Sequence, residues 1–225
     1  MSHLEDLIAE YCPDGVDLLP LSDVLIYSQP TPYIVKSTNY CDSYSIPVLT
    51  AGATFLLGHI DEKVGVYKAT SETPVIIFDD FTTAFKWVDF NFKVKSSAIK
   101  ILTEKDSLKA VLRYIYYAMR CINFEPTDHA RHWIQSYSTF LIPVPPIIVQ
   151  REIVRILDKM TYLEAELEAE LEAELEARIL QYEHYRDDLL DFNSDVPRPP
   201  RLTHLLQTLC PDGVEFKSLN EVASI

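Results

Sequence analysis

Glycine is scarce in this sequence, and its scarcity limits the chemistry that the chain can perform. Only five of the 225 residues are glycine, and they form no Gly-rich loop behind a predicted strand. Such a loop lets backbone amides approach the phosphates of a nucleotide. An Asn/Asp-Pro-Pro-aromatic motif is also missing, because Pro145-Pro146 follows Val144. We therefore expect no nucleotide or S-adenosylmethionine site and no cofactor.

Cysteines in metal-binding or redox patterns and long apolar runs are missing too. The four cysteines contain no CxxC pair and have no histidine at zinc spacing, so we expect free thiols and no metal site. No run approaches about eighteen apolar residues, the length of a membrane span. The N-terminus lacks the basic and then apolar pattern of a secretory leader. We expect a cytoplasmic protein without a membrane segment.

Catalytic motifs are weak. Asp61-Glu62-Lys63 resembles part of a nuclease site, but such a tripeptide is expected by chance. Asp79-Asp80 is typical of a capped turn more than of a metal site. A small nuclease or methyltransferase is therefore disfavoured, and we predict no catalytic residue.

A long helix is the dominant feature that is present. Residues Gln150–Phe192 contain no glycine or proline, and leucine recurs every fourth residue between Leu163 and Leu175. Alanine keeps the same step and nearly all other positions are Glu, so every residue type favours a helix. At about 1.5 Å per residue the helix spans roughly 60 Å. It is predicted to be a spacer or a surface for a partner.

Two interpretations of the repeat stay open. It is either a solvated acidic helix of low complexity or a coiled-coil ruler whose length depends on the number of four-residue units. Four residues turn a helix by about 400°, so the leucine row drifts by about 40° per repeat. The coiled-coil interpretation predicts a partner surface formed by Ile153, Ile156, Leu157, Met160, Leu163, Leu167, Leu171, Leu175, Ile179 and Tyr182.

The net charge of −14 is concentrated on this helix. Residues 151–191 carry five Lys and Arg against thirteen Asp and Glu, whereas residues 1–150 carry twelve against seventeen. The first part is still not basic, so composition gives no electrostatic proof of nucleic-acid binding. Any basic surface must arise from local clustering.

Residues before the helix show a mixed pattern of short strands and one amphipathic helix. Strands are predicted at Ile46–Thr50, Thr54–Leu57, Val64–Lys68, Pro74–Phe78, Phe85–Val88, Ala98–Leu102 and Phe140–Pro143. A helix capped by Asp106 is predicted from the spacing of Leu108, Val111, Leu112, Ile115, Tyr116 and Met119. The fold class is therefore α+β: a globular mixed α/β domain followed by a long coiled-coil-forming helix.

One segment occurs twice. Cys12-Pro13-Asp14-Gly15-Val16 returns as Cys210-Pro211-Asp212-Gly213-Val214, and four apolar residues keep the same offset of 198: Leu4, Leu7, Leu21 and Val24 match Leu202, Leu205, Leu219 and Val222. Each copy predicts a short amphipathic helix that ends at a Pro-Asp-Gly turn. The chain thus finishes by restarting its first domain. We predict domains at residues 1–145, 146–192 and 193–225.

Two polar–aromatic groups are candidates for recognition. Arg and Gln can make bidentate contacts to base edges, and Lys and Arg can hold phosphates. The predicted DNA-binding residues are Lys86, Lys93, Lys95, Arg131, His132, Trp133, Gln135 and Tyr137. For the lysine group a solvated hairpin edge is the favoured alternative, and for the second group a surface loop is an equally simple explanation.

Several segments resemble the specificity subunits of type I restriction–modification systems. They are the junction Pro143–Asp158, the strand and turn Ile76–Thr83, the segment Phe92–Ser97, both Cys-Pro-Asp-Gly-Val copies and the four-residue repeat. The resemblance covers essentially the whole chain. Family members usually hold two recognition domains and two helices, so one of each here leads us to expect a half-length form.

The resemblance implies a non-catalytic protein that binds double-stranded DNA. Its domain would be a target-recognition domain that reads one half of a split sequence. Its helix would pair antiparallel with a second copy in a homodimer, and it would dock modification (methyltransferase) subunits and through them restriction subunits. The alternative is a coiled-coil adaptor whose globular domain binds protein instead of DNA.

Overall fold

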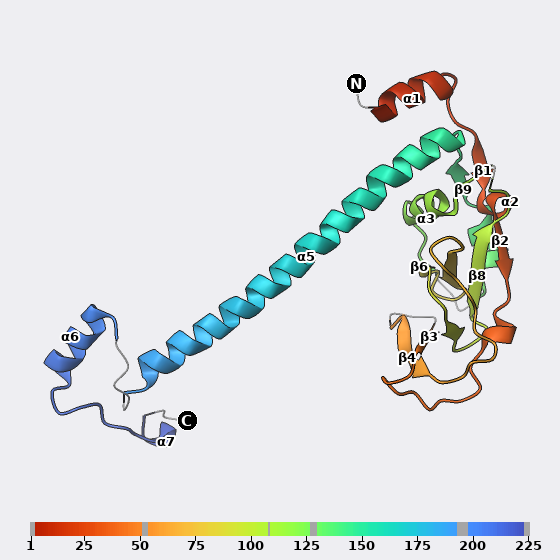
Figure 1. Ribbon diagram of the computed structural model, residues 1–225. Helices are drawn as coiled ribbons and strands as arrows, with labels where there is room; N and C mark the ends of the chain where they lie inside the picture. Colours follow the sequence, from red (N-terminus) through yellow and green to blue (C-terminus); the bar gives the residue numbers. More distant parts are fainter. Residues whose placement is uncertain (1–2, 51–53, 108, 127–129, 193–197, 223–225) are drawn as a thin grey trace. The chain divides into compact units, whose positions relative to one another are not determined.

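The computed structural model describes residues 3–50, 54–107, 109–126, 130–192 and 198–222 (Figure 1). The chain divides into two compact units, Met1–Lys159 and Met160–Ile225, and one helix runs across the boundary. This division does not test the predicted domain limits, which stay a prediction.

The first unit combines short strands with short helices. Its helical elements are α1 (His3–Tyr11), α2 (Leu21–Val24), η1 (Thr31–Tyr33), α3 (Leu112–Arg120), α4 (His132–Gln135) and η2 (Tyr137–Thr139). Its strands are β1 (Leu18–Pro20), β2 (Leu25–Ser28), β3 (Ile46–Leu49), β4 (Leu56–Ile60), β5 (Val75–Asp79), β6 (Phe85–Val88), β7 (Lys93–Val94), β8 (Ile99–Glu104) and β9 (Leu141–Pro143). The long helix α5 (Ile147–Leu190) follows, and α6 (Pro200–Leu209) and α7 (Leu219–Val222) belong to the second unit. The α+β class predicted from the sequence is confirmed.

The strands form three sheets among the described residues. The largest is antiparallel, with the order β2-β8-β5-β6; β4-β3-β7 and the pair β1-β9 form the others. Strand β5 is buried on both faces. Because side chains alternate along a strand, Ile76 and Phe78 enter one core while Val75 and Ile77 enter another. The large sheet is therefore covered on both sides.

Most of the predicted elements are present. The strands predicted around β3, β5, β6, β8 and β9 are confirmed, and β4 begins two residues later than predicted. The strand predicted at Val64–Lys68 is wrong: the segment makes only an isolated bridge from Tyr67 to Phe92. Gly65 there has φ +68°, and a Cβ would lie 2.4 Å from the Pro32 carbonyl oxygen, so the chain turns instead of extending.

The helix predicted from Asp106 starts later than expected, at Leu112. Val111 has an extended backbone, and its amide donates to Gln150 Oε1 instead of to a helical carbonyl. Of the residues that predicted this helix, Leu108 lies outside the described part. Leu112, Ile115 and Met119 are buried as the spacing predicts.

The long helix has 44 residues without interruption (Figure 1). It begins after Pro145 and Pro146, and the Pro146 carbonyl accepts the amides of Val149 and Gln150. Proline is well suited to this position, because its missing N–H has no partner in a first helical turn. The prediction of one uninterrupted helix is confirmed.

Candidate nucleic-acid interface

The loop that carries the second polar–aromatic group is anchored at the end of β5. The Asp80 carbonyl accepts the His132 amide at 2.8 Å, and Asp80 Oδ1 accepts the Trp133 amide at 2.9 Å. Lys100 Nζ lies 3.2 Å from Asp80 Oδ2, and both side chains are completely buried. The position of α4 is therefore set by a buried carboxylate whose charge is neutralised from the neighbouring strand.

Aromatic packing fixes the same loop from inside. The rings of Trp133 and Tyr137 lie 5.1 Å and 4.8 Å from the ring of Phe78, and Phe124 packs against His132 and Tyr137. Burial raises the pKa of Tyr137 to about 12. Trp133, Tyr137 and His132 are thus core side chains here. DNA binding by these three stays a prediction, and it would require their exposure.

Arg131 and Gln135 from the same loop are exposed to solvent. The Arg131 guanidinium lies 6.0 Å from the Phe81 ring centre, on the turn that follows β5. Asp79 shapes that turn by accepting the Phe81 amide at 2.9 Å and the Thr82 hydroxyl at 2.7 Å. The arrangement presents a cation and an amide on a supported loop, next to a capped turn. The capped-turn interpretation is correct for Asp79, whereas the Asp80 side chain binds the Trp133 amide and pairs with Lys100.

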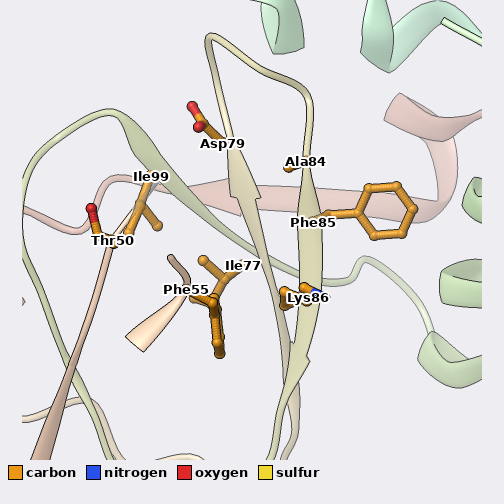
Figure 2. Close-up of a pocket in the computed structure, with 8 residues that line it drawn as sticks. All are labelled: Thr50, Phe55, Ile77, Asp79, Ala84, Phe85, Lys86 and Ile99. Atoms are coloured by element: carbon orange, nitrogen blue, oxygen red, sulfur yellow. The ribbon is translucent and has the colours of Figure 1, made fainter. Parts of the chain in front are cut away.

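The three predicted lysines lie in different surroundings. Lys86 is exposed on β6 and lines a small pocket with Phe55 and Ile77 (Figure 2). Lys95 is exposed, with Nζ 3.5 Å from the Tyr40 hydroxyl. Lys93 is buried: its Nζ lies 2.9 Å from Glu62 Oε2 and donates to the Val64 carbonyl at 2.7 Å. Its bond to Glu62 lowers the pKa of that carboxyl group. Its ammonium group is used inside the domain, so a phosphate contact would require breaking this pair.

Sequence reasoning missed the structural roles of Asp80, Lys100 and Phe81. A signal existed for Lys100, which interrupts the apolar strand β8 between Ile99 and Ile101. A charged residue inside a buried strand needs a charged or polar partner. The sequence does not indicate that Asp80 is this partner.

The junction with α5 is held by polar groups of the helix. Gln150 is completely buried; its Oε1 accepts the Val111 amide, and its Nε2 donates to the carbonyls of Lys109 and Pro145 at 2.9 Å and 2.7 Å. About two helical turns further along α5, Asp158 Oδ1 accepts hydrogen bonds from Arg113 Nε at 2.7 Å and from the Tyr117 hydroxyl at 2.6 Å. The first turns of α5 are therefore a part of the folded unit.

The predicted partner surface on α5 divides into a covered and an exposed part. Ile153 packs with Leu7 and Val149, and Ile156 and Leu157 are half-buried. The remaining members of the row expose between 49% and 66% of their surface: Met160, Leu163, Leu167, Leu171, Leu175, Ile179 and Tyr182. Such a continuous exposed apolar row is typical of a surface that binds a partner.

Membrane-spanning helices and metal-binding clusters are both absent from the described residues. None of the helices there is long and apolar enough to cross a membrane. No cluster of three His, Cys, Asp or Glu side chains there is arranged to hold a metal ion.

The sequence of this chain is similar to that of known proteins. Residues 13–177 match the family described as type I restriction modification DNA specificity domain. The chain is 51% identical over 205 residues to the type I restriction enzyme EcoR124I/EcoR124II specificity subunit of Escherichia coli; the match covers 86% of this chain and 48% of that protein. It is 48% identical over 77 residues to the EcoprrI specificity subunit of Escherichia coli, covering 31% and 19% of the two chains.

The fold is also similar to a solved structure. The S subunit of a type I restriction–modification system from M. genitalium aligns with a TM-score of 0.54 and 15% identity, covering 79% of this chain and 47% of that one. The chain thus spans about half the length of the EcoR124I/EcoR124II relative and of this S subunit. The match over residues 13–177 and the identity to the Escherichia coli subunit show that the chain belongs to the type I restriction modification DNA specificity domain family.

Proposed function

We propose that this chain is a non-catalytic, cytoplasmic specificity subunit that recognises one half of a bipartite DNA target. Two copies would pair as a homodimer through antiparallel α5 helices and would dock methyltransferase subunits, through which restriction subunits join. In this proposal residues 1–145 are the recognition domain and residues 146–192 the spacer. The Escherichia coli relative, which is named as a specificity subunit of a type I restriction enzyme, supports it.

The observation that carries DNA recognition is the supported loop with Arg131 and Gln135 exposed. The Asp80–Lys100 pair and the packing of Trp133 against Phe78 hold the loop backbone, so the backbone needs little ordering on binding. Both residue types can read base edges bidentately. A rigid scaffold that presents such side chains on a loop is the usual arrangement of a binding site.

The test is to map methylated sites after co-expression with the cognate modification subunit. We expect a split motif whose halves are inverted repeats, because a twofold dimer presents the same domain to both halves. Methylation of an asymmetric motif would contradict the homodimer. If the complex formed and no site were modified, the adaptor alternative would replace DNA recognition.

Truncation of Arg131 or Gln135 to alanine is expected to weaken binding of the mapped duplex roughly tenfold to a hundredfold. A bidentate base contact contributes about 1–3 kcal/mol to discrimination between bases. Arg131 precedes α4 without a side-chain capping bond, so its loss should leave the fold intact. Fluorescence anisotropy with the full complex measures the effect.

Arg120→Ala is the matched control, because Arg120 is an exposed arginine at the end of α3. An equal loss of affinity in that variant would reveal only a general effect of charge. Unchanged affinity and sequence preference for Arg131→Ala and Gln135→Ala would rule out the loop as the reading surface.

The exposed apolar row on α5 supports the dimer, and it predicts a ruler. Insertion of one Leu-Glu-Ala-Glu unit lengthens the helix by about 6 Å, the length of one to two base-pair steps of about 3.4 Å. We expect the mapped spacer between the half-sites to grow by one or two base pairs, with both halves unchanged. Glu168→Gln is the control, because it changes the repeat without changing the length of α5. The spacer between the half-sites should stay the same in this variant. A constant spacer after insertion would contradict the ruler.

A further inference from the structure

The two copies of the repeated segment adopt the same local structure. In the first copy the Cys12 amide donates to the Ile8 carbonyl at 2.9 Å, and Gly15 follows with φ +100°. In the second copy the Cys210 amide donates to the Leu206 carbonyl at 2.9 Å, and Gly213 has φ +96°. Each glycine closes its Pro-Asp-Gly turn: the Gly15 amide donates to the Cys12 carbonyl at 3.1 Å, and the Gly213 amide donates to the Cys210 carbonyl at 3.0 Å. Helix α6 is therefore a structural copy of α1, as their sequences predict.

The copies differ in what covers their apolar faces. In the first copy, Leu7 of α1 and the following Cys12 form a buried cluster with Val149, and Ile153 at the start of α5 packs against this cluster. In α6 the residue that matches Leu7 is Leu205, which is 43% exposed. The contrast continues beyond the turn, where Leu21 is completely buried and its counterpart Leu219 is 80% exposed. The second copy thus has the face that α1 buries and leaves it open to solvent.

The start of α5 in the same chain is too far away to cover that face. From Ile153 to the end of α5 at Leu190 the helix rises roughly 56 Å at 1.5 Å per residue. The connection from Leu190 to Pro200 reaches at most about 36 Å when fully extended, and the first turn of α6 adds less than about 10 Å. The acceptor for α6 must therefore come from another helix of the same kind.

The charges of α6 fit the same acceptor. His3 of α1 helps, after Arg155, to lower the pKa of Glu152 on α5. The residue of α6 that matches His3 is Arg201, which keeps a cation at this position at every pH. The acidic residues Glu5, Asp6 and Glu10 of α1 are replaced in α6 by Thr203, His204 and Thr208. Helix α6 therefore carries less negative charge than α1 and keeps a cation at the position that faces Glu152 at the start of α5.

We propose that α6 docks on the start of α5 in a second copy of this chain. There it takes the place of the α1 helix of that copy. Leu205 and Cys210 then lie against Val149 and Ile153 of the partner. The inference rests on the antiparallel homodimer of the proposed function, which brings the end of one α5 beside the start of the other. Each copy would thereby hold its partner through both helix ends.

A disulfide trap in the full 225-residue chain tests this exchange. Cys12, Cys41 and Cys121 are replaced by serine, Cys210 is kept, and Ile153→Cys is added. Because a disulfide forms only between Cα atoms within about 7 Å, oxidation is expected to give a disulfide-linked dimer on a non-reducing gel. A positive control keeps Cys12 and replaces Cys210, and it compares Ile153→Cys with Val149→Cys; the position that links to Cys12 within one chain is the one used with Cys210.

Val154→Cys is the matched control for position. Val154 lines a groove with Arg113 and Asp158, and Ile153 packs toward α1. Equal cross-linking of both positions to Cys210 would reveal random collision and overturn the exchange. Sedimentation of the same samples distinguishes failure of the helix exchange from failure of the homodimer. A dimer without the Ile153–Cys210 link would overturn the exchange alone, whereas a monomer would overturn the homodimer and the exchange together.

Substitution of an exposed leucine gives a second measurement with all native cysteines in place. Leu205→Asp is expected to raise the dissociation constant of the dimer about tenfold, because the buried face loses a leucine. Leu209→Asp is the control, since Leu209 matches the exposed Tyr11 of α1. An equal effect of both substitutions, or none for Leu205→Asp, would overturn the exchange.

Discussion

Replacement of Lys100 by methionine is expected to lower the free energy of unfolding by about 3–5 kcal/mol. Methionine keeps much of the length and volume of the lysine chain but removes its charge. Asp80 would then be a carboxylate with no exposed surface and no cation at 3.2 Å. A buried charge that loses its partner keeps its full desolvation penalty, which explains the size of the effect. Urea unfolding followed by tryptophan fluorescence measures it, because Trp133 is buried on the anchored loop.

The double variant Asp80→Asn and Lys100→Met separates pairing from packing. Asparagine has no charge, and its side-chain oxygen can still accept the Trp133 amide that Asp80 accepts at 2.9 Å. We expect the double variant to recover at least half of the lost stability. Lys95→Met is the matched control, because Lys95 is exposed, and it should change stability by less than about 1 kcal/mol. Equal losses for Lys100→Met and Lys95→Met would contradict the structural role of the buried pair.

Elements whose signal is local could be predicted from the sequence. The strand Phe85–Val88 has the predicted bounds, and α5 follows from a tandem repeat of strong helix formers. Apolar periodicity predicted the buried face of α3 through Leu112, Ile115 and Met119. These signals lie within a few residues of the element that they specify.

Features set by contacts between distant residues could not be predicted. In the sequence Lys93 looks like the exposed Lys86 and Lys95. In the structure its ammonium group is buried and binds Glu62 and the Val64 carbonyl. The start of α3 likewise depends on Gln150, which takes the Val111 amide. Periodicity contains no information about such partners. In the candidate site, the exposure of Arg131 and Gln135 agrees with the surface position predicted for them, while the burial of Trp133 and Tyr137 does not.

Replacement of Gln150 by leucine is expected to lower the free energy of unfolding by about 3 kcal/mol. Gln150 makes three hydrogen bonds, to the Val111 amide and to the carbonyls of Lys109 and Pro145. A buried polar group that loses its partner costs about 1–3 kcal/mol. Pro145 is buried, whereas Val111 and Lys109 are partly open to water that can replace the lost bond. The expected value is therefore below the sum of three full penalties.

Gln150→Glu sharpens the test, because glutamate has the same shape and keeps the oxygen that accepts the Val111 amide. A carboxylate in place of Nε2 would face the carbonyl oxygens of Lys109 and Pro145, so we expect a loss that shrinks as the pH falls and the carboxyl group is protonated. Gln181→Leu is the matched control, since Gln181 is exposed on the same helix. If Gln150→Leu and Gln181→Leu had equal stability, the junction would be held by apolar packing around Val149 instead of by the Gln150 hydrogen bonds.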